Sequence, residues 1–179
     1  LLAEETRADD WPQWRGPTRD GVWKETGIIQ EFPGLQLALR WRAPVGNGYS
    51  GPTVADGRVY VTDRQIEPRQ IERVHCFDWQ TGRKLWTYSY DCSYRRVGYT
   101  AGPRASVSID GGRAFALGTM GHLHCLDAAT GNVLWEKEPD VDYQVRVPIW
   151  GIASAPLVDG DRVIVQIGAA DGADRKSVV

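Results

Sequence analysis

Short segments in which apolar and polar residues alternate recur along this chain, and turn residues separate them. Alternation with a period of two places every second side chain on one face of a β-strand. The clearest alternating segments are 73–78 and 122–127, and apolar stretches at 57–61 and 112–117 precede them. No apolar pattern with a period of 3.6 residues extends beyond about two helical turns. The pattern therefore predicts an all-β fold.

A nine-residue phrase occurs twice in the sequence. Residues 78–86 read DWQTGRKLW and residues 127–135 read DAATGNVLW, so five residue types recur at an offset of 49 residues. The dipeptide His-Cys recurs at the same offset, at 75–76 and 124–125. A period of this length is typical of propellers and other repeat proteins, in which each unit buries its apolar face against its neighbours.

The repeated phrase predicts a β-hairpin with a turn of about four residues. Its Asp can accept hydrogen bonds from backbone N–H groups further along the turn, and its Gly can adopt a positive φ. The Trp then lies on the strand that follows. The residues with this structural role are Asp78, Thr81, Gly82, Trp86, Asp127, Thr130, Gly131 and Trp135.

With the apolar stretches that precede each hairpin, every unit has four short strands, which is the composition of a propeller blade. We predict complete blades at about 50–90 and 104–138, and the start of a third at 152–167. These two and a half blades are too few for a ring, which needs at least about four. We therefore expect the chain to be an N-terminal fragment of a longer propeller.

The chain divides into an N-terminal extension at 1–34 and a partial propeller at 35–179. The extension contains the sequence WPQWRGPTRDG at 11–21. We interpret this segment as packing its aromatic rings over the edge or bottom of the ring, with a ligand platform of stacked Trp as the alternative. Residues 35–45 alternate at first, which predicts an outer strand that closes the ring by sharing a blade with the far end of the chain.

Composition and charge exclude some classes of function. The formal net charge of −2 and the pI near 5.9 give no basic field for nucleic acid. No apolar run approaches the ~18 residues of a membrane span. The first three residues, Leu-Leu-Ala, are consistent with the end of a signal peptide.

The three Cys of the chain predict no zinc site and no disulfide framework. Two of the three Cys occupy equivalent repeat positions, which favours buried apolar roles, with a disulfide between adjacent blades as the alternative.

The repeat resembles that of the pyrroloquinoline-quinone-like propellers, the quinoprotein alcohol dehydrogenase superfamily. The opening WPQWRGP at 11–17 is similar to the start of secreted bacterial members of this group. The resemblance implies an eight-bladed ring in the full protein and a periplasmic or secreted location. It also implies that Trp86 and Trp135 are largely buried on outer strands, where each docks against a neighbouring blade. WD and kelch repeats fit less well, because no Trp-Asp dipeptide closes the third strand and paired Gly occur only at 111–112 rather than in each blade.

The resemblance leaves two classes of function open. Quinone-dependent members use an adjacent Cys-Cys disulfide, a catalytic Asp and a calcium or lanthanide site, and no two Cys are adjacent in this sequence. The superfamily also contains non-enzymatic scaffolds of outer-membrane protein assembly. We therefore expect a secreted or periplasmic scaffold that binds a protein partner or a small molecule. The alternative is an alcohol or sugar dehydrogenase that uses pyrroloquinoline quinone with calcium.

The segments that lead into the inner strands are the candidate binding site, because inner strands line the central channel of a propeller. Each segment offers an aromatic residue followed by small or hydroxyl residues. The candidates are Tyr49, Ser50, Tyr99, Arg104, Trp150 and Ser154. Stacking and a guanidinium would suit a planar anionic ligand, with plain channel lining as the alternative. We expect Arg104 to face water or an acidic neighbour.

Other candidate chemistry is weak. His122 and His124 share one face of a strand at a spacing that can bind a metal, but the sequence suggests no third ligand. Asp78 and Asp127 are explained by their turns. We predict no catalytic residue and no metal site from these positions. The long loop at 91–99 is expected at one mouth of the ring, where binding loops lie.

Overall fold

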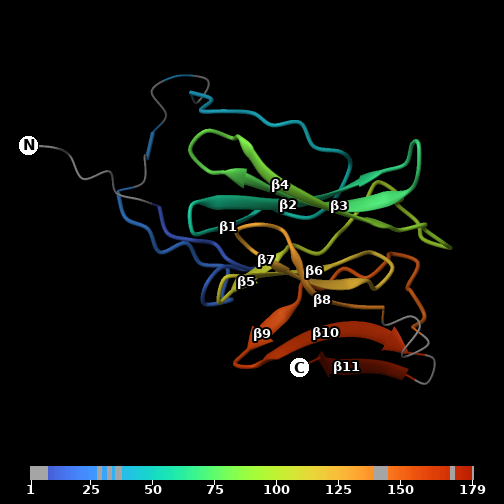
Figure 1. Cartoon of the computed structure of the whole chain (residues 1–179). Helices are drawn as coiled ribbons and strands as arrows, with labels where there is room; N and C mark the ends of the chain where they lie inside the picture. The colour runs from blue at the N-terminus through green and yellow to red at the C-terminus, as the bar shows by residue number, and fades with distance from the viewer. Residues whose placement is uncertain are drawn as a thin grey trace, which may run out of the picture.

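The computed structural model describes residues 8–27, 30–31, 34, 38–138, 145–169 and 172–178. Within these ranges the chain forms eleven β-strands in three antiparallel sheets and no helix. Accordingly, the described residues contain no helix that could cross a membrane. The three sheets follow one another in chain order and stack side by side (Figure 1). The all-β prediction is confirmed.

Each sheet is a meander of neighbouring strands. The first contains β1 (Thr53–Ala55), β2 (Arg58–Gln65), β3 (Ile71–Asp78) and β4 (Lys84–Asp91). The second contains β5 (Ser108–Asp110), β6 (Arg113–Leu117), β7 (Leu123–Asp127) and β8 (Val133–Lys137). The third contains β9 (Leu157–Asp159), β10 (Arg162–Ala169) and β11 (Gly172–Val178). The two predicted four-stranded blades are therefore present, and the third blade begins where the sequence places it.

The spacing of the blades departs from 49 residues in one place. Arg113 and Arg162, which open the second strands of successive blades, are 49 residues apart, but Arg58 and Arg113 are 55 apart. The difference lies in the first blade, where β2 and β3 have eight residues each, against five in β6 and β7. The β2–β3 hairpin therefore extends further from the sheet than its counterpart in the second blade.

The repeated turn has the predicted geometry in both blades. The Thr81 N–H donates to Asp78 Oδ1 over 2.8 Å, and the Thr130 N–H donates to Asp127 Oδ1 over the same distance. Each Thr hydroxyl donates to the same carboxylate oxygen, so the side chain of Asp holds the turn twice. Gly82 and Gly131 have φ values of +69° and +76°, which explains why the turn requires glycine.

Trp86 docks on the turn of the next blade. Its indole Nε1 donates to the carbonyl of Ala128 over 3.1 Å. A Cβ added to Gly131 would lie 2.6 Å from Trp86 Cδ2, so the ring lies directly on the glycine. The predicted contact with a neighbouring blade is therefore confirmed for Trp86. Trp86 and Trp135 are half-buried rather than largely buried, because each lies on an outer strand with one face towards solvent.

Trp41 docks on the first blade in the same way. Its Nε1 donates to the carbonyl of Trp79 over 2.8 Å, and a Cβ on Gly82 would lie 2.6 Å from its ring. The strand predicted at 35–45 is not observed over its described part, 38–45, because no described strand runs beside it. A Trp can therefore occupy the docking position without a surrounding sheet. The predicted role of residues 35–45 in closing the ring stays a prediction.

Two apolar cores lie between the sheets. The first joins Tyr60 and Val74 of the first blade to Ala114 and Leu126 of the second. The second joins residues of the second blade to the third. Each blade therefore buries its apolar face only against its neighbours, as expected for a repeat protein. The three Cys are buried free thiols at the described positions, so the alternative of a disulfide between adjacent blades is not realised.

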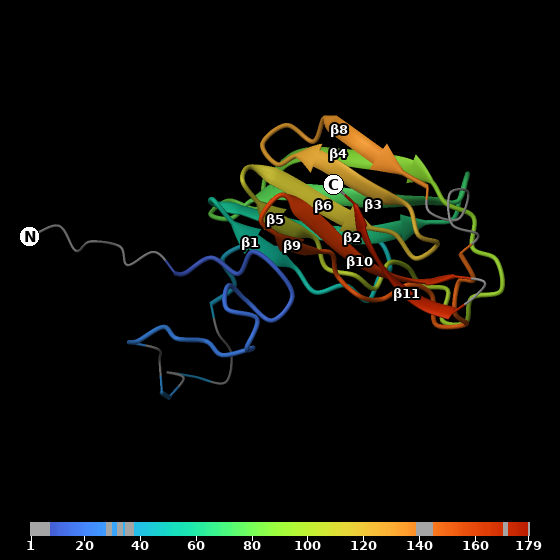
Figure 2. The same cartoon turned by 90° about the horizontal axis from the view of Figure 1, so that it is seen from below.

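The N-terminal segment, residues 8–27, runs along the inner strands of all three blades. Trp11 and Val54 of β1 exchange backbone hydrogen bonds of 2.8 and 3.1 Å, and the carbonyl of Pro12 accepts from Ile109 of β5. Arg19 Nη2 donates to the carbonyl of Val158 in β9 over 2.6 Å. Figure 2 shows this segment (blue) at the end where β1, β5 and β9 lie together.

The aromatic rings of this segment do not pack as the first interpretation expected. Trp11 is half-buried against Gly16, but Trp14 is 63% exposed and Trp23 is 58% exposed. The backbone of the segment, rather than its rings, makes the contact with the blades. Trp14 instead lines a cavity between this segment and the inner strands.

Candidate functional site

The three segments predicted to lead into the inner strands converge on Arg104. The backbone N–H of Tyr49 donates to the carbonyl of Pro103 over 2.8 Å, which joins the first segment to the second. Arg104 Nε donates to the carbonyl of Trp150 over 2.8 Å, which joins the second segment to the third. The guanidinium also lies 5.2 Å from the centre of the Tyr49 ring. Four of the six predicted site residues, Tyr49, Tyr99, Arg104 and Trp150, are thereby brought together.

The guanidinium of Arg104 has all five of its N–H groups engaged by neutral oxygens. Besides Trp150, it donates to the carbonyls of Gly98 and Tyr99 through Nη2, and to the carbonyl of Gly102 and the hydroxyl of Thr119 through Nη1. Arg104 is partly exposed, and backbone carbonyls of the two surrounding loops, rather than an acidic neighbour, take up most of its donors. Arg104 therefore holds these loops in place.

Around Arg104 lies an exposed aromatic surface that we call the mouth patch. It consists of Tyr49, Tyr99, Ile149 and Trp150, and each of these side chains is more than half exposed. The rings of Tyr99 and Trp150 are stacked, with centroids 5.2 Å apart and planes inclined by 30°. Exposed apolar side chains that gather in one place mark interaction sites more often than isolated ones do.

The backbone beneath the stacked pair is constrained. Tyr99 has a φ of +53°, which is unusual for a residue with a side chain and costs of order 1–3 kcal/mol. Gly151, next to Trp150, has a φ of +72°, and a Cβ there would lie 2.5 Å from Thr119 Cγ2. The loops therefore present the two rings in one fixed arrangement that Arg104 maintains.

The two serines of the predicted site are engaged within their own blades. Ser50 Oγ lies 2.7 Å from Thr62 Oγ1, and Ser154 Oγ donates to the carbonyl of Gln166 over 3.3 Å. Both hydroxyls thus join the leading segment of a blade to its second strand. They are not part of the mouth patch.

A buried carboxylate supports the mouth patch from below. Glu72 of β3 is fully buried and accepts hydrogen bonds from the hydroxyls of Tyr90 and Tyr94. The backbone N–H of Thr119, in the second blade, lies 3.2 Å from Glu72 Oε1. The hydroxyl of Thr119 in turn contacts both Tyr94 and Arg104. Glu72 therefore links two blades and the loop that carries Tyr99.

Both phenols in this network remain protonated donors. Burial, reinforced by the negative charge of Glu72, raises the pKa of Tyr90 and of Tyr94 well above the usual value of 10.0. The ring of Tyr94 also lies 3.6 Å from the guanidinium carbon of Arg64, which is itself 7% exposed. A cation and a carboxylate thus flank Tyr94 on the inner side of the loop at 91–99.

A second buried carboxylate holds the first blade together. Asp63 of β2 is fully buried, and its two oxygens accept from Arg73 Nε and Nη2 over 2.7 and 2.8 Å. Asp63 Oδ2 also lies 3.0 Å from His75 Nε2 and accepts from the Gly46 N–H. Burial alone would raise the pKa of Asp63, but these hydrogen bonds lower it below the usual 3.8.

Sequence reasoning missed Asp63 and Glu72. The signal that could have identified them is a charged residue at a position of β2 or β3 that the alternation assigns to the interior.

His122 and His124 do not form a metal site in the part of the chain that the structure describes. No group of three or more His, Cys, Asp and Glu side chains suited to a metal ion occurs there. His124 Nδ1 instead lies 3.1 Å from the hydroxyl of Tyr88, across the blade interface. Burial, with a smaller effect of the nearby His122, lowers the pKa of His124 to about 4. Its imidazole is therefore neutral at neutral pH.

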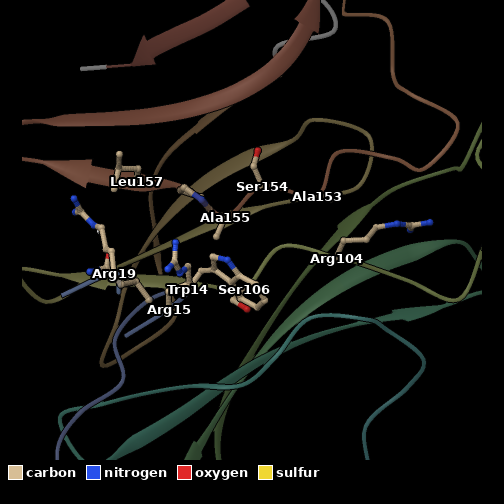
Figure 3. A pocket seen from close by; sticks show the side chains of 11 residues that line it. Trp14, Arg15, Arg19, Arg104, Ser106, Ala153, Ser154, Ala155 and Leu157 are labelled. Atoms are coloured by element: carbon tan, nitrogen blue, oxygen red, sulfur yellow. Dashed lines mark hydrogen bonds between the residues drawn. The ribbon is translucent and has the colours of Figure 1, made fainter. Parts of the chain in front are cut away.

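A cavity of about 370 Å³ lies between the N-terminal segment and the inner strands. Its lining comes from both sides (Figure 3): Gln13, Trp14, Arg15 and Arg19 from the segment, and Arg104, Ser106 and residues 153–157 from the blades. No acidic residue is among them. Arg104 contributes only its stem, because its guanidinium points away from the other labelled side chains.

Solved structures with a similar fold include a methanol dehydrogenase and two quinohemoprotein alcohol dehydrogenases. The chain is 25% identical to a europium-containing methanol dehydrogenase, with a TM-score of 0.55 over 75% of this chain and 23% of that one. It is 27% identical to the quinohemoprotein alcohol dehydrogenase of Comamonas testosteroni, with a TM-score of 0.52 over 70% of this chain and 18% of that one. It is also 25% identical to the quinohemoprotein alcohol dehydrogenase ADHIIG of Pseudomonas putida HK5, with a TM-score of 0.54 over 73% of this chain and 18% of that one.

The chain spans less than a quarter of the length of these three enzymes. No curated protein matches it. A family model matches residues 70–177, from β3 to β11, and it describes the outer membrane protein assembly factor BamB. Since this match covers more than half of the chain, and the described residues fold into the repeated blades of a propeller, the chain belongs to the pyrroloquinoline-quinone-like repeat family of the assembly factor BamB.

Proposed function

We propose that the protein containing this chain is an extracytoplasmic propeller that binds a protein partner through the mouth patch. The observation that carries this proposal is the stacked pair of Tyr99 and Trp150, whose rings are exposed while Arg104 binds the backbone carbonyls of both residues. Membership of a family described as an assembly factor supports a role in protein interaction and a location outside the cytoplasm. An eight-bladed ring remains part of this proposal.

The composition of the mouth patch is that of an interface centre. Tyr, Trp and Arg are the residues most enriched where binding energy concentrates. A surface fixed before binding loses less conformational entropy on association than a mobile one. Here Arg104 and the strained backbone of Tyr99 have already fixed the two rings.

The charge around the patch indicates the chemistry of the partner. Arg95 and Arg96 are exposed on the same loop as Tyr99, and this loop is tied to Ile149 by a 2.7 Å hydrogen bond from the Gly98 N–H. Opposite charges across an interface guide association and select the partner. We therefore propose a partner segment that presents carboxylates next to apolar side chains.

A quinone-dependent dehydrogenase is the second candidate, and the similarity to three such enzymes favours it. The residues at the mouth do not fit the cofactor well. Pyrroloquinoline quinone carries three carboxylates, and the guanidinium that could have met them has every N–H engaged by a protein oxygen. We therefore rank the binding role first and derive no reaction step.

Site-specific crosslinking in the native host tests the binding role. A photoreactive amino acid placed at position 99 or 150 should give a discrete adduct with one partner, because both side chains are exposed at the patch. The same amino acid at position 133, which is exposed on β8 away from the patch, is the control. Replacing Tyr49 by Ala should reduce the adduct from position 150. An absence of adducts at 99 and 150, or the same adducts from position 133, would rule out this surface.

A further inference from the structure

We propose that the cavity between the N-terminal segment and the inner strands binds a carboxylate attached to a flat or apolar body. This site shares the stem of Arg104 with the support of the mouth patch, but it contains none of the four residues of that patch and does not depend on the proposed partner. Its volume of about 370 Å³ is in the range of small-molecule sites.

The cavity is positively charged in a protein whose net charge is negative. Arg15 and Arg19 line it, and none of the described residues that line it is acidic. Arg15 uses only Nη2, which donates to the carbonyl of Asp20 over 3.1 Å. Arg19 uses Nε on Gln13 and Nη2 on Val158. Among the described residues, Nε and Nη1 of Arg15 and Nη1 of Arg19 have no acceptor, so both guanidinium groups retain N–H donors for an anion.

A buried hydroxyl supplies the second observation. Ser106 is 5% exposed and lines the cavity, and its Oγ makes no hydrogen bond to any residue of the described part of the chain. The Oγ atom is not among the fully buried side-chain atoms that lack a partner, so it opens onto the cavity, where it can form a hydrogen bond to a ligand. Ser108, two residues along, shows the contrast, because its Oγ donates to the carbonyl of Pro156.

The two arginines are held on unusual backbone. Arg15 and Arg19 have φ values of +66° and +58°, in a region that residues with side chains rarely adopt. Hydrogen bonds from Gly16 N to the Gln13 carbonyl and from Gly21 N to the Arg15 carbonyl fix the turns that contain them. Strained residues of this kind cluster at ligand clamps. Figure 3 shows Arg15 beside Trp14 and Arg19 reaching towards β9.

The remaining lining selects the body of the ligand. Trp14 is 63% exposed and offers an aromatic ring, and Ala155, Pro156 and Leu157 add apolar side chains to the lining. A ligand that stacks on Trp14 can direct its carboxylate to the arginines and to Ser106. Two sources have this chemistry: a free aromatic or aliphatic acid, and the carboxyl terminus of a polypeptide.

Calorimetric titration of the protein, as its gene encodes it, tests the site. The probes are 2-naphthoate and its neutral counterpart 2-naphthamide. We expect 2-naphthoate to bind and the amide to bind at least about tenfold more weakly, because it lacks the charge that the arginines recognise. An acetylated peptide that ends in a free Leu carboxylate, and the same peptide as an amide, identify the source. Tighter binding of the free peptide than of 2-naphthoate assigns the site to a polypeptide terminus, and the reverse assigns it to a free acid.

Variants connect the binding to the named residues. Arg15→Gln should weaken 2-naphthoate binding about tenfold, and Ser106→Ala should weaken it severalfold. The matched control is Arg83→Gln, an exposed arginine on the β3–β4 turn of the first blade, which should change nothing. Urea unfolding of each variant shows whether the fold is retained. Equal binding of the acid and the amide, no binding of either, or equal effects of the variants at 15 and 83 would each overturn the proposal.

Discussion

We expect Trp86→Ala to lower the free energy of unfolding by about 3 kcal/mol, the lower end of the range for truncating a core Trp. The lower end applies because Trp86 is half-buried. The substitution removes the ring from Gly131 and leaves the carbonyl of Ala128 without the indole N–H. Urea unfolding measures the loss. The control is Trp23→Ala, since Trp23 is 58% exposed in the N-terminal segment and should cost little.

A double-mutant cycle with Gly131 isolates the docking contact. Gly131→Ala alone is destabilising for two reasons, the φ of +76° and the clash of the new Cβ with the indole. In the Trp86→Ala background the clash disappears while the backbone strain remains. We therefore expect Gly131→Ala to cost less in that background. Additive costs, or a Trp86→Ala variant as stable as the Trp23→Ala control, would show that the ring does not join the blades.

Asp63→Asn is expected to lower the free energy of unfolding by about 3–5 kcal/mol, the usual effect of breaking a buried ion pair from one side. Asparagine keeps the shape of the side chain but removes the charge that Arg73 and the Gly46 N–H meet. The matched control is Asp161→Asn. Its carboxylate lies 3.9 Å from Arg162 with both side chains mostly exposed, so its loss should be nearly neutral.

The pH dependence of stability gives a second measurement on Asp63. The pKa of Asp63 in the folded protein is lower than the usual 3.8 of the unfolded chain. Its ionised carboxylate therefore stabilises the fold fully well above pH 3.8, and this stabilisation is lost progressively as the pH falls towards the pKa of the folded state. Between about pH 5 and pH 3 the Asp63→Asn variant should therefore lose less stability than the unaltered protein. A variant with the same acid sensitivity would show that Asp63 gains nothing from its ionised form.

The sequence was sufficient for the repeated parts of the fold. Asp78 and Asp127 were identified as turn residues because the same carboxylate must serve the same backbone N–H groups in each copy. The contact of Trp86 with the next blade was predicted from the family resemblance, because periodicity alone places the Trp on a strand without naming its partner. The six additional residues between Arg58 and Arg113 were not anticipated, because a longer hairpin leaves the alternation on either side unchanged.

The candidate site was predictable only in part. The aromatic residues at 49, 99 and 150 were identified because each leads into an inner strand, and they do surround Arg104. The role of Arg104 could not be read from the sequence, since its partners are backbone carbonyls that any residue could supply. The cavity was missed for a related reason. Arg15 and Arg19 reach the inner strands only through the path of the N-terminal segment.

The most direct test of a binding role rather than an enzymatic one is an oxidation assay with the protein as its gene encodes it. The protein is incubated with pyrroloquinoline quinone and calcium, and alcohol and sugar oxidation is followed with an artificial electron acceptor. A quinone-dependent alcohol dehydrogenase is the positive control. We expect no turnover above that of cofactor without protein, because the donors of Arg104 are committed to the loops. Turnover that requires both the protein and the quinone would contradict the binding role.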